Sequence, residues 1–205
     1  MADQKHWDSV YGQKTGDQVS WYRPHLDRSM QFIEAAGLSK DAPIIDVGGG
    51  TSTFVDDLVD RGHSNVTVLD LSQAAISAAK ERLGPRAGNA SWIAADITQF
   101  ELPHHRYDFW HDRAVFHFLA DPEDRSRYVA AVRRGLKPGG HIVVATFGPH
   151  GPERCSGLEV VRYDAEQLHA QFGSSFERVA SSEEIHRTPW GTEQEFVYCY
   201  CRLDT

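Results

Sequence analysis

Blocks of hydrophobic residues alternate along the chain with segments whose apolar residues recur at helical spacing. Short apolar runs typical of buried strands occur at 42–47, 66–69, 92–95, 107–111 and 141–147. Helical spacing is found before and between these runs, at 24–37, 51–61, 72–83 and 122–136. Strands that alternate with helices predict a mainly parallel sheet with helices on both faces.

The C-terminal part of the chain departs from this alternation. Residues 148–157 are rich in Gly and Pro and predict a loop, and 164–172 predicts a helix. Two β segments follow, at about 176–187 and 193–202, with only a Thr-Pro-Trp-Gly turn between them. They predict an antiparallel hairpin, whereas a dinucleotide-binding domain would continue with a sixth parallel strand.

Composition narrows the class of protein. The chain has 205 residues, 40% of them apolar, which suits one compact domain with a substantial core. Its net charge of −8 argues against nonspecific binding to nucleic acid. The polar N-terminus has no signal-peptide pattern, and the apolar runs are too short to cross a bilayer, so we expect a soluble, cytoplasmic protein.

The stretch IIDVGGGTST at 44–53 carries the first sign of chemistry. Three glycines after a strand permit close approach of a ligand to the backbone, and the following helix offers free N–H groups that suit a carboxylate or a phosphate. The triphosphate loop G-x-x-x-x-G-K-[ST] is excluded because no Lys follows. The dinucleotide fingerprint matches only in part, since its third glycine position is Thr53.

Two further acids follow predicted strands. Asp70 ends VTVLD and can accept hydrogen bonds from both hydroxyls of an adenosine ribose; the alternative is a helix cap, for which Ser72 competes. Asp96 and Ile97 follow the third strand, where an acid can accept from an adenine amino group and Ile97 can pack on the ring. The alternative for Asp96 is an ordinary turn residue.

The segments IDVGGGTST, VTVLDLS, AADIT, YDFWHDRAVFHFL and LKPGG occur in this order between about residues 40 and 147. Together they resemble the ordered motifs of class I S-adenosylmethionine-dependent methyltransferases. The resemblance implies a Rossmann-like, doubly wound α/β fold with seven strands, the last antiparallel. It implies S-adenosyl-L-methionine as cofactor and S-adenosyl-L-homocysteine as product. The implied cofactor-binding residues are Asp46, Gly48, Gly49, Gly50, Asp70, Leu71, Asp96, Ile97 and Asp112.

On this interpretation the chain is a single methyltransferase domain with three parts. Residues 1–37 form an N-terminal lid and helix, 40–147 the cofactor-binding core, and 148–205 a loop, a helix and the terminal hairpin. Methyl transfer depends mainly on positioning the acceptor in a desolvated pocket, and a base is needed only if the acceptor must lose a proton. Catalytic residues are therefore not defined by the sequence.

The segment YDFWHDRAVFHFL supplies the catalytic candidates His111, Asp112 and His117, with Arg113 as a substrate contact. It resembles the W-D-R-G segment of thiopurine-type and related small-molecule thiol methyltransferases, with Ala114 in place of Gly. The alternative is that Asp112 and Arg113 pair with each other and cap the next helix.

The N-terminal segment HWDSVYGQKTGDQVSWYRPHL concentrates aromatic residues in polar surroundings. We expect Trp7, Tyr11, Trp21 and Tyr22 to form a lid over the cofactor and to contact substrate; the alternative is that the tryptophans only fasten the segment to the core. The W-D-x-x-Y and W-Y patterns resemble methyltransferase-like protein-lysine methyltransferases, although those usually have D-K-G where this chain has Asp112-Arg113-Ala114.

The loop FGPHGPERCSG places His150 on the ligand side as a further substrate candidate. His150 and Cys155 lack a third well-spaced ligand, so we expect no metal site. An odd number of cysteines predicts a reducing compartment without a disulfide framework. Cys199 and Cys201 share one face of a strand and are expected to be buried, whereas the role of Cys155 stays open.

We therefore expect a methyltransferase acting on a small-molecule nucleophile such as a thiol, without nucleic-acid or membrane partners. A protein-lysine N-methyltransferase with a protein acceptor is the alternative, and a noncatalytic binder of adenosine nucleotides is a third hypothesis. The sequence leaves open the identity of the acceptor, the use of a general base and the oligomeric state.

Overall fold

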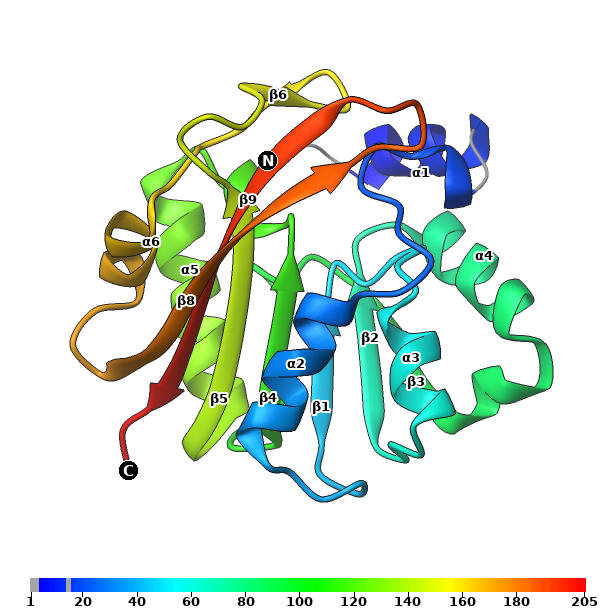
Figure 1. The fold of residues 1–205 in the computed structure, drawn as a ribbon. Helices are drawn as coiled ribbons and strands as arrows, with labels where there is room; N and C mark the ends of the chain where they lie inside the picture. Colours follow the sequence, from blue (N-terminus) through cyan, green and yellow to red (C-terminus); the bar gives the residue numbers. More distant parts are fainter. Residues whose placement is uncertain (1–3, 14–15) are drawn as a thin grey trace.

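The computed structural model describes residues 4–13 and 16–205 (Figure 1). Its main sheet has seven strands in the order β3-β2-β1-β4-β5-β9-β8. These strands are β1 (Ile44–Val47), β2 (Val66–Asp70), β3 (Ala90–Ala94), β4 (Tyr107–Arg113), β5 (Leu136–Phe147), β8 (Phe176–Arg187) and β9 (Glu193–Leu203). The first five strands pair in parallel, and β9 pairs antiparallel with both β5 and β8. The predicted mostly parallel seven-stranded sheet with an antiparallel last strand is confirmed.

Helices cover both faces of the sheet. They are α1 (Gln4–Gln13), α2 (Asp27–Ala36), α3 (Phe54–Asp60), α4 (Gln73–Leu83), α5 (Pro122–Gly135) and α6 (Ala165–Phe172). Side chains of α2 and α3 pack in one buried cluster with β1 and β2, and side chains of α5 and α6 pack in a second cluster with β4 and β5. Among the described residues, no helix combines the length and the apolar character that a membrane span requires.

Local sequence accounts for where several helices begin. Ser72 caps α4 by accepting a hydrogen bond from the backbone N–H of Ala75 at 3.1 Å. Asp121 precedes Pro122 at the start of α5, where proline loses no hydrogen bond. Asp164 and Gln167 form a capping box at the start of α6.

Three segments differ from the sequence predictions. Residues 4–13 form the helix α1, which lies beside α4 above the carboxyl ends of the strands (Figure 1). The strand β5 begins at Leu136, five residues before the strand expected at 141–147, and Leu136 was expected to end the preceding helix. The loop at 148–157 contains the strand β6 (Arg154–Cys155), which pairs with β7 (Leu158–Glu159). The remaining elements are short 3₁₀ turns at Gly16–Gln18, Gly84–Asn89 and Phe116–Phe118.

Candidate active site

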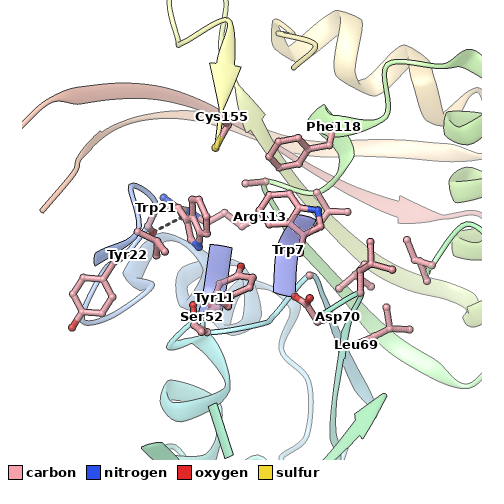
Figure 2. Close-up of a pocket in the computed structure, with 18 of the residues that line it drawn as sticks. Trp7, Tyr11, Trp21, Tyr22, Ser52, Leu69, Asp70, Arg113, Phe118 and Cys155 are labelled. Atoms are coloured by element: carbon pink, nitrogen blue, oxygen red, sulfur yellow. Dashed lines mark hydrogen bonds between the residues drawn. The ribbon is translucent and has the colours of Figure 1, made fainter. Parts of the chain in front are cut away.

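One cavity lies at the carboxyl ends of β1, β2 and β4, beneath α1 (Figure 2). The space between its walls amounts to about 970 Å³, part of which is open to solvent. The strand order changes direction between β1 and β4, which is where open α/β sheets bind ligands. The position of the cavity therefore follows from the topology of the sheet.

The glycine turn after β1 forms the floor of the cavity. Gly48 has a φ of +69°, and a Cβ built there would lie 1.9 Å from Cγ2 of Val115. At Gly50 a Cβ would lie 2.7 Å from Oδ2 of Asp70 and 3.3 Å from the hydroxyl of Tyr11. Larger residues would therefore fill the space between the turn, Asp70 and the lid.

Asp70 faces the cavity from the end of β2. It is 7% exposed, and its Oδ1 accepts a hydrogen bond from the backbone N–H of Ser72 at 2.7 Å. Burial raises the pKa of this carboxyl group to about 7, and the hydrogen bond from Ser72 opposes that rise. Leu71, Asp96 and Ile97 line the same side of the cavity. Asp96 also accepts hydrogen bonds from the backbone and the hydroxyl of Thr98, both at 2.8 Å.

The opposite side of the cavity is aromatic. The rings of Trp7, Tyr11, Trp21 and Phe118 contact one another, with centroids 5.0–6.2 Å apart, and Tyr22 completes this wall. Burial, followed by the nearby Asp70, raises the pKa of Tyr11 well above its ordinary value. The lid expected from the sequence therefore lies over the strand ends (Figure 2).

The helix α1 is attached to the body by a side-chain cap. Oδ1 of Asp8 accepts hydrogen bonds from the hydroxyl of Ser72 at 2.5 Å and from the backbone N–H of Ala74 at 3.3 Å. The carboxylate of Asp8 therefore lies at the N-terminus of α4, and α4 begins shortly after Asp70 in the sequence. The lid and the Asp70 side of the cavity thus share one anchoring point.

The histidine candidates lie outside the lining of the cavity. His111 is 1% exposed and donates from Nδ1 to Oδ1 of Asp46 at 2.7 Å, while its Nε2 lies 2.8 Å from the hydroxyl of Ser29. His117 is fully buried, accepts from the backbone N–H of Phe147 at 3.3 Å, and has its pKa lowered to about 3 by burial. His150 is exposed, and its backbone N–H donates to Glu195.

Asp46, Gly49 and Asp112 support the cavity from below. Oδ2 of Asp46 lies beneath Gly49, where a Cβ would approach it to 2.5 Å, and this oxygen has no hydrogen-bond partner. Asp112 accepts from the backbone N–H groups of Val115 and Phe116 and from the hydroxyl of Tyr128 at 2.5 Å. Burial raises the pKa of Asp112 to about 7, and these hydrogen bonds oppose the rise.

Several lining residues were not anticipated from the sequence. They include Val19, Arg23, Leu26, Thr51, Ser52, Phe118 and Cys155. Cys155 reaches the cavity because β6 folds back over the strand ends, which a loop sequence does not reveal (Figure 2).

Cys199 and Cys201 are both 1% exposed, and their sulfur atoms lie 3.3 Å apart. Among the described residues there is no cluster of three His, Cys, Asp or Glu side chains placed to hold a metal ion.

The strand order and the cavity at the strand ends define a Rossmann-like fold of the class I methyltransferase type. Residues 44–140 match the family model of the methyltransferase domain. The malonyl-[acyl-carrier protein] O-methyltransferase of Paenibacillus sp. (strain JDR-2) is 30% identical over 187 residues, which are 88% of this chain and 64% of that protein. The EEF1A lysine methyltransferase 2 of Danio rerio is 24% identical over 160 residues, 71% of this chain and 69% of that protein.

Solved structures share the fold over almost the whole chain. A structure reported for the conversion of a disulfide bond into a thioacetal group during echinomycin biosynthesis has a TM-score of 0.78 at 21% identity, covering 98% of this chain and 92% of that one. The 1,6-didemethyltoxoflavin-N1-methyltransferase of Burkholderia thailandensis, with S-adenosylhomocysteine bound, has a TM-score of 0.72 at 20% identity, covering 100% and 92%. The chain therefore carries a sequence match to the methyltransferase domain over residues 44–140 and shares the fold of S-adenosylmethionine-dependent methyltransferases. It spans just under two thirds of the length of the Paenibacillus relative.

Proposed function

We propose that this protein transfers the methyl group of S-adenosylmethionine to a small-molecule nucleophile. The observation that carries the proposal is the cavity bounded by strand ends on one side and by the aromatic lid on the other. Its lining combines carboxylates at the strand ends with aromatic rings opposite them, so that a cofactor and a small acceptor would meet different walls. The relationship to a malonyl-[acyl-carrier protein] O-methyltransferase supports methyl transfer.

The side of the cavity formed by the strand ends fits an adenosine cofactor. We assign Asp70, with Leu71 beside it, to the ribose hydroxyls, and Asp96 with Ile97 to the adenine. The glycines at 48–50 leave room for the methionine part, and Asp46 offers an unpaired carboxylate oxygen below them. Asp112 acts indirectly in this proposal, because its hydrogen bonds fix the turn that holds Val115 against Gly48.

When bound, S-adenosylmethionine supplies an electrophilic methyl group on a sulfonium. The protein contributes by excluding water and by positioning the acceptor, which are the main sources of rate enhancement in such a transfer. The rings of Trp7, Trp21 and Phe118 perform the first task by closing the cavity. The acceptor then lies between these rings and the glycine turn.

Two measurements test the proposal. Calorimetry should show binding of S-adenosylmethionine and S-adenosylhomocysteine, and no comparable binding of NAD. A screen with methyl-labelled cofactor should then label small acceptors, thiols included. Binding without transfer to any acceptor would favour a noncatalytic binder of adenosine nucleotides.

Protein-lysine N-methylation is the second candidate. The W-D-x-x-Y pattern and the relationship to a lysine methyltransferase of Danio rerio favour it. A lysine acceptor would be helped by a carboxylate near the aromatic wall, but the two carboxylates among the lining residues, Asp70 and Asp96, follow the strand ends. Labelling of a protein while small acceptors stay inert would establish this candidate in place of the first.

A further inference from the structure

An excess of positive charge lies behind the aromatic wall. Arg23 and Arg113 both line the cavity, and Arg23 forms an ion pair with Glu184. The second oxygen of Glu184 accepts from the hydroxyl of Tyr198 at 2.7 Å, and that hydroxyl accepts from Nε of Arg113 at 3.1 Å. Two guanidinium groups therefore share one carboxylate, which leaves one positive charge uncompensated in this network.

Arg113 is held in place with part of its hydrogen-bonding capacity unused. Its Nη1 donates to the backbone oxygen of Trp21 at 3.1 Å, and its guanidinium lies 4.2 Å from the ring centroid of Phe196. Its Nη2 is buried and has no hydrogen-bond partner. Leaving a buried donor unpaired is unfavourable, and more so for a charged group. Figure 2 shows the side chain of Arg113 between Trp21 and Trp7, next to the space enclosed by the lid.

The groups around Arg113 do not neutralise it. His186 donates from Nε2 to the backbone oxygen of Ser20 at 2.6 Å, and burial followed by the charge of Arg113 lowers its pKa to about 4. His117 is also neutral near pH 7, since its pKa is about 3. The partner of Arg113 must therefore come from outside this part of the protein.

The aromatic side of the cavity also lacks a general base. The lining residues there include no His, Lys, Asp or Glu, within the part of the chain that the structure describes. Tyr11 remains a neutral phenol, because its pKa is raised. An acceptor that must lose a proton during transfer would find no imidazole, amine or carboxylate on this side; Cys155 contributes a thiol, and Asp70 and Asp96 lie at the strand ends.

We propose that the acceptor is an apolar or aromatic carboxylate, bound by the guanidinium group of Arg113 and methylated on oxygen. This inference rests on the proposed methyltransferase function and adds the class of acceptor. A lone pair of the carboxylate oxygen forms the new C–O bond, and the bond between carbon and sulfur breaks with its electrons on sulfur. The products are a methyl ester and a neutral thioether, and no proton is released. A carboxylate is also the partner that the planar fork of arginine matches best.

The first test measures binding without turnover. The probe is 4-phenylbutanoate, compared with its amide 4-phenylbutanamide, in calorimetry with S-adenosylhomocysteine present. We expect the wild-type protein to bind the carboxylate at least about tenfold more tightly than the amide. Equal affinity would overturn the proposal, and this comparison needs no variant.

Substitutions then assign the preference to Arg113. Arg113→Gln should abolish the preference for the carboxylate, whereas Arg113→Lys should retain part of it because the charge remains. Arg127→Gln is the matched control, since Arg127 lies on the exposed surface of α5 and pairs with Glu123. Thermal melting of each variant confirms folding. A preference that survives Arg113→Gln would overturn the assignment.

A competing partner for Arg113 is the carboxylate of the cofactor's own methionine part. In that case Arg113→Gln would weaken S-adenosylhomocysteine about tenfold and leave 5′-methylthioadenosine, which lacks the amino-acid part, unchanged. That outcome would overturn the acceptor proposal. The acceptor proposal would also be overturned if the protein binds S-adenosylhomocysteine and labels thiols or amines, but does not label carboxylates. In that case the methyltransferase function stands. If the wild-type protein binds neither S-adenosylmethionine nor S-adenosylhomocysteine, the methyltransferase function itself is refuted.

Discussion

The two sides of the cavity are supported in different ways. The side with Asp70 and the glycine turn follows buried strands, and the residues below it, Asp46 and His111, are each 1% exposed. The lid side begins with α1, which has no fully buried residue and is anchored by the cap from Asp8. Global unfolding free energy should therefore depend on the strand side, whereas opening of the lid should be a local event of low cost.

The largest expected effect lies beneath the strand side. His111→Ala removes the partner of a buried carboxylate, and we expect a loss of about 3–5 kcal/mol in unfolding free energy. Ser29→Ala is the matched control, because it removes only the outer hydrogen bond of His111, for about 1 kcal/mol. Urea unfolding measures both. A stable His111→Ala protein that loses only transfer would return His111 to the list of catalytic candidates.

Asp70 tests the strand side by affinity. Asp70→Asn should weaken S-adenosylhomocysteine by about 1.5–3 kcal/mol, the value of hydrogen bonds to a charged group. Calorimetry near pH 8 gives the number, with Asp96→Asn as a comparison at the neighbouring strand end. Unchanged affinity in Asp70→Asn would remove this residue from the ribose site.

The raised pKa of Asp70 makes the same site sensitive to pH. Ribose hydroxyls donate best to the ionised form, so affinity for S-adenosylhomocysteine should rise up to about tenfold per pH unit toward pH 7 and level off above it. Stability without ligand should move the other way. The folded protein holds the proton more tightly than the unfolded chain, so stability falls as pH rises from about 4 to about 7. In Asp70→Asn, the affinity for S-adenosylhomocysteine and the unfolding free energy should both depend less on pH. Calorimetry measures the first and urea unfolding the second.

The anchor of the lid should give a smaller, local effect. Asp8→Ala removes the two hydrogen bonds at the start of α4, worth about 1 kcal/mol in total. Hydrogen exchange should speed up in α1 while the main sheet remains protected. Ser9→Ala, on the exposed face of the same helix, serves as control. Equal acceleration throughout the sheet would contradict the local opening of α1.

The smallest effect concerns His150. It is exposed and lies outside the cavity lining, so His150→Ala should leave both cofactor affinity and transfer rate unchanged.

Trp21→Ala is the comparison on the lid side. It opens the aromatic wall and should lower the transfer rate by roughly tenfold, because water enters and the acceptor is less well positioned. A tenfold loss in His150→Ala would show that the loop closes over the acceptor.

The contrast between the two sides also explains what the sequence could reveal. The strand side follows from alternating apolar runs and from acids at strand ends, and its topology was predictable. The helix α1 escaped prediction because its aromatic residues face the cavity and leave no apolar stripe toward the core. His111 and His117 resembled catalytic groups in a list of residues, but only the packing shows that both lie outside the cavity. The packing likewise shows the opposite result for Cys155, which β6 brings into the lining of the cavity.

The segment that matches the methyltransferase-domain model, 44–140, includes Gly48, Asp70 and Asp96, whereas Trp7, Trp21 and Cys155 lie outside it. The aromatic wall is thus assembled largely from the two flanks of that segment, with Phe118 and the neighbouring Arg113 contributed by the segment itself. Under the proposed function, substitutions in those flanks would change the acceptor side and leave Gly48, Asp70 and Asp96 in place. For protein engineering, libraries confined to residues 4–26 and 148–160 would explore new acceptors with little risk to the domain that carries them.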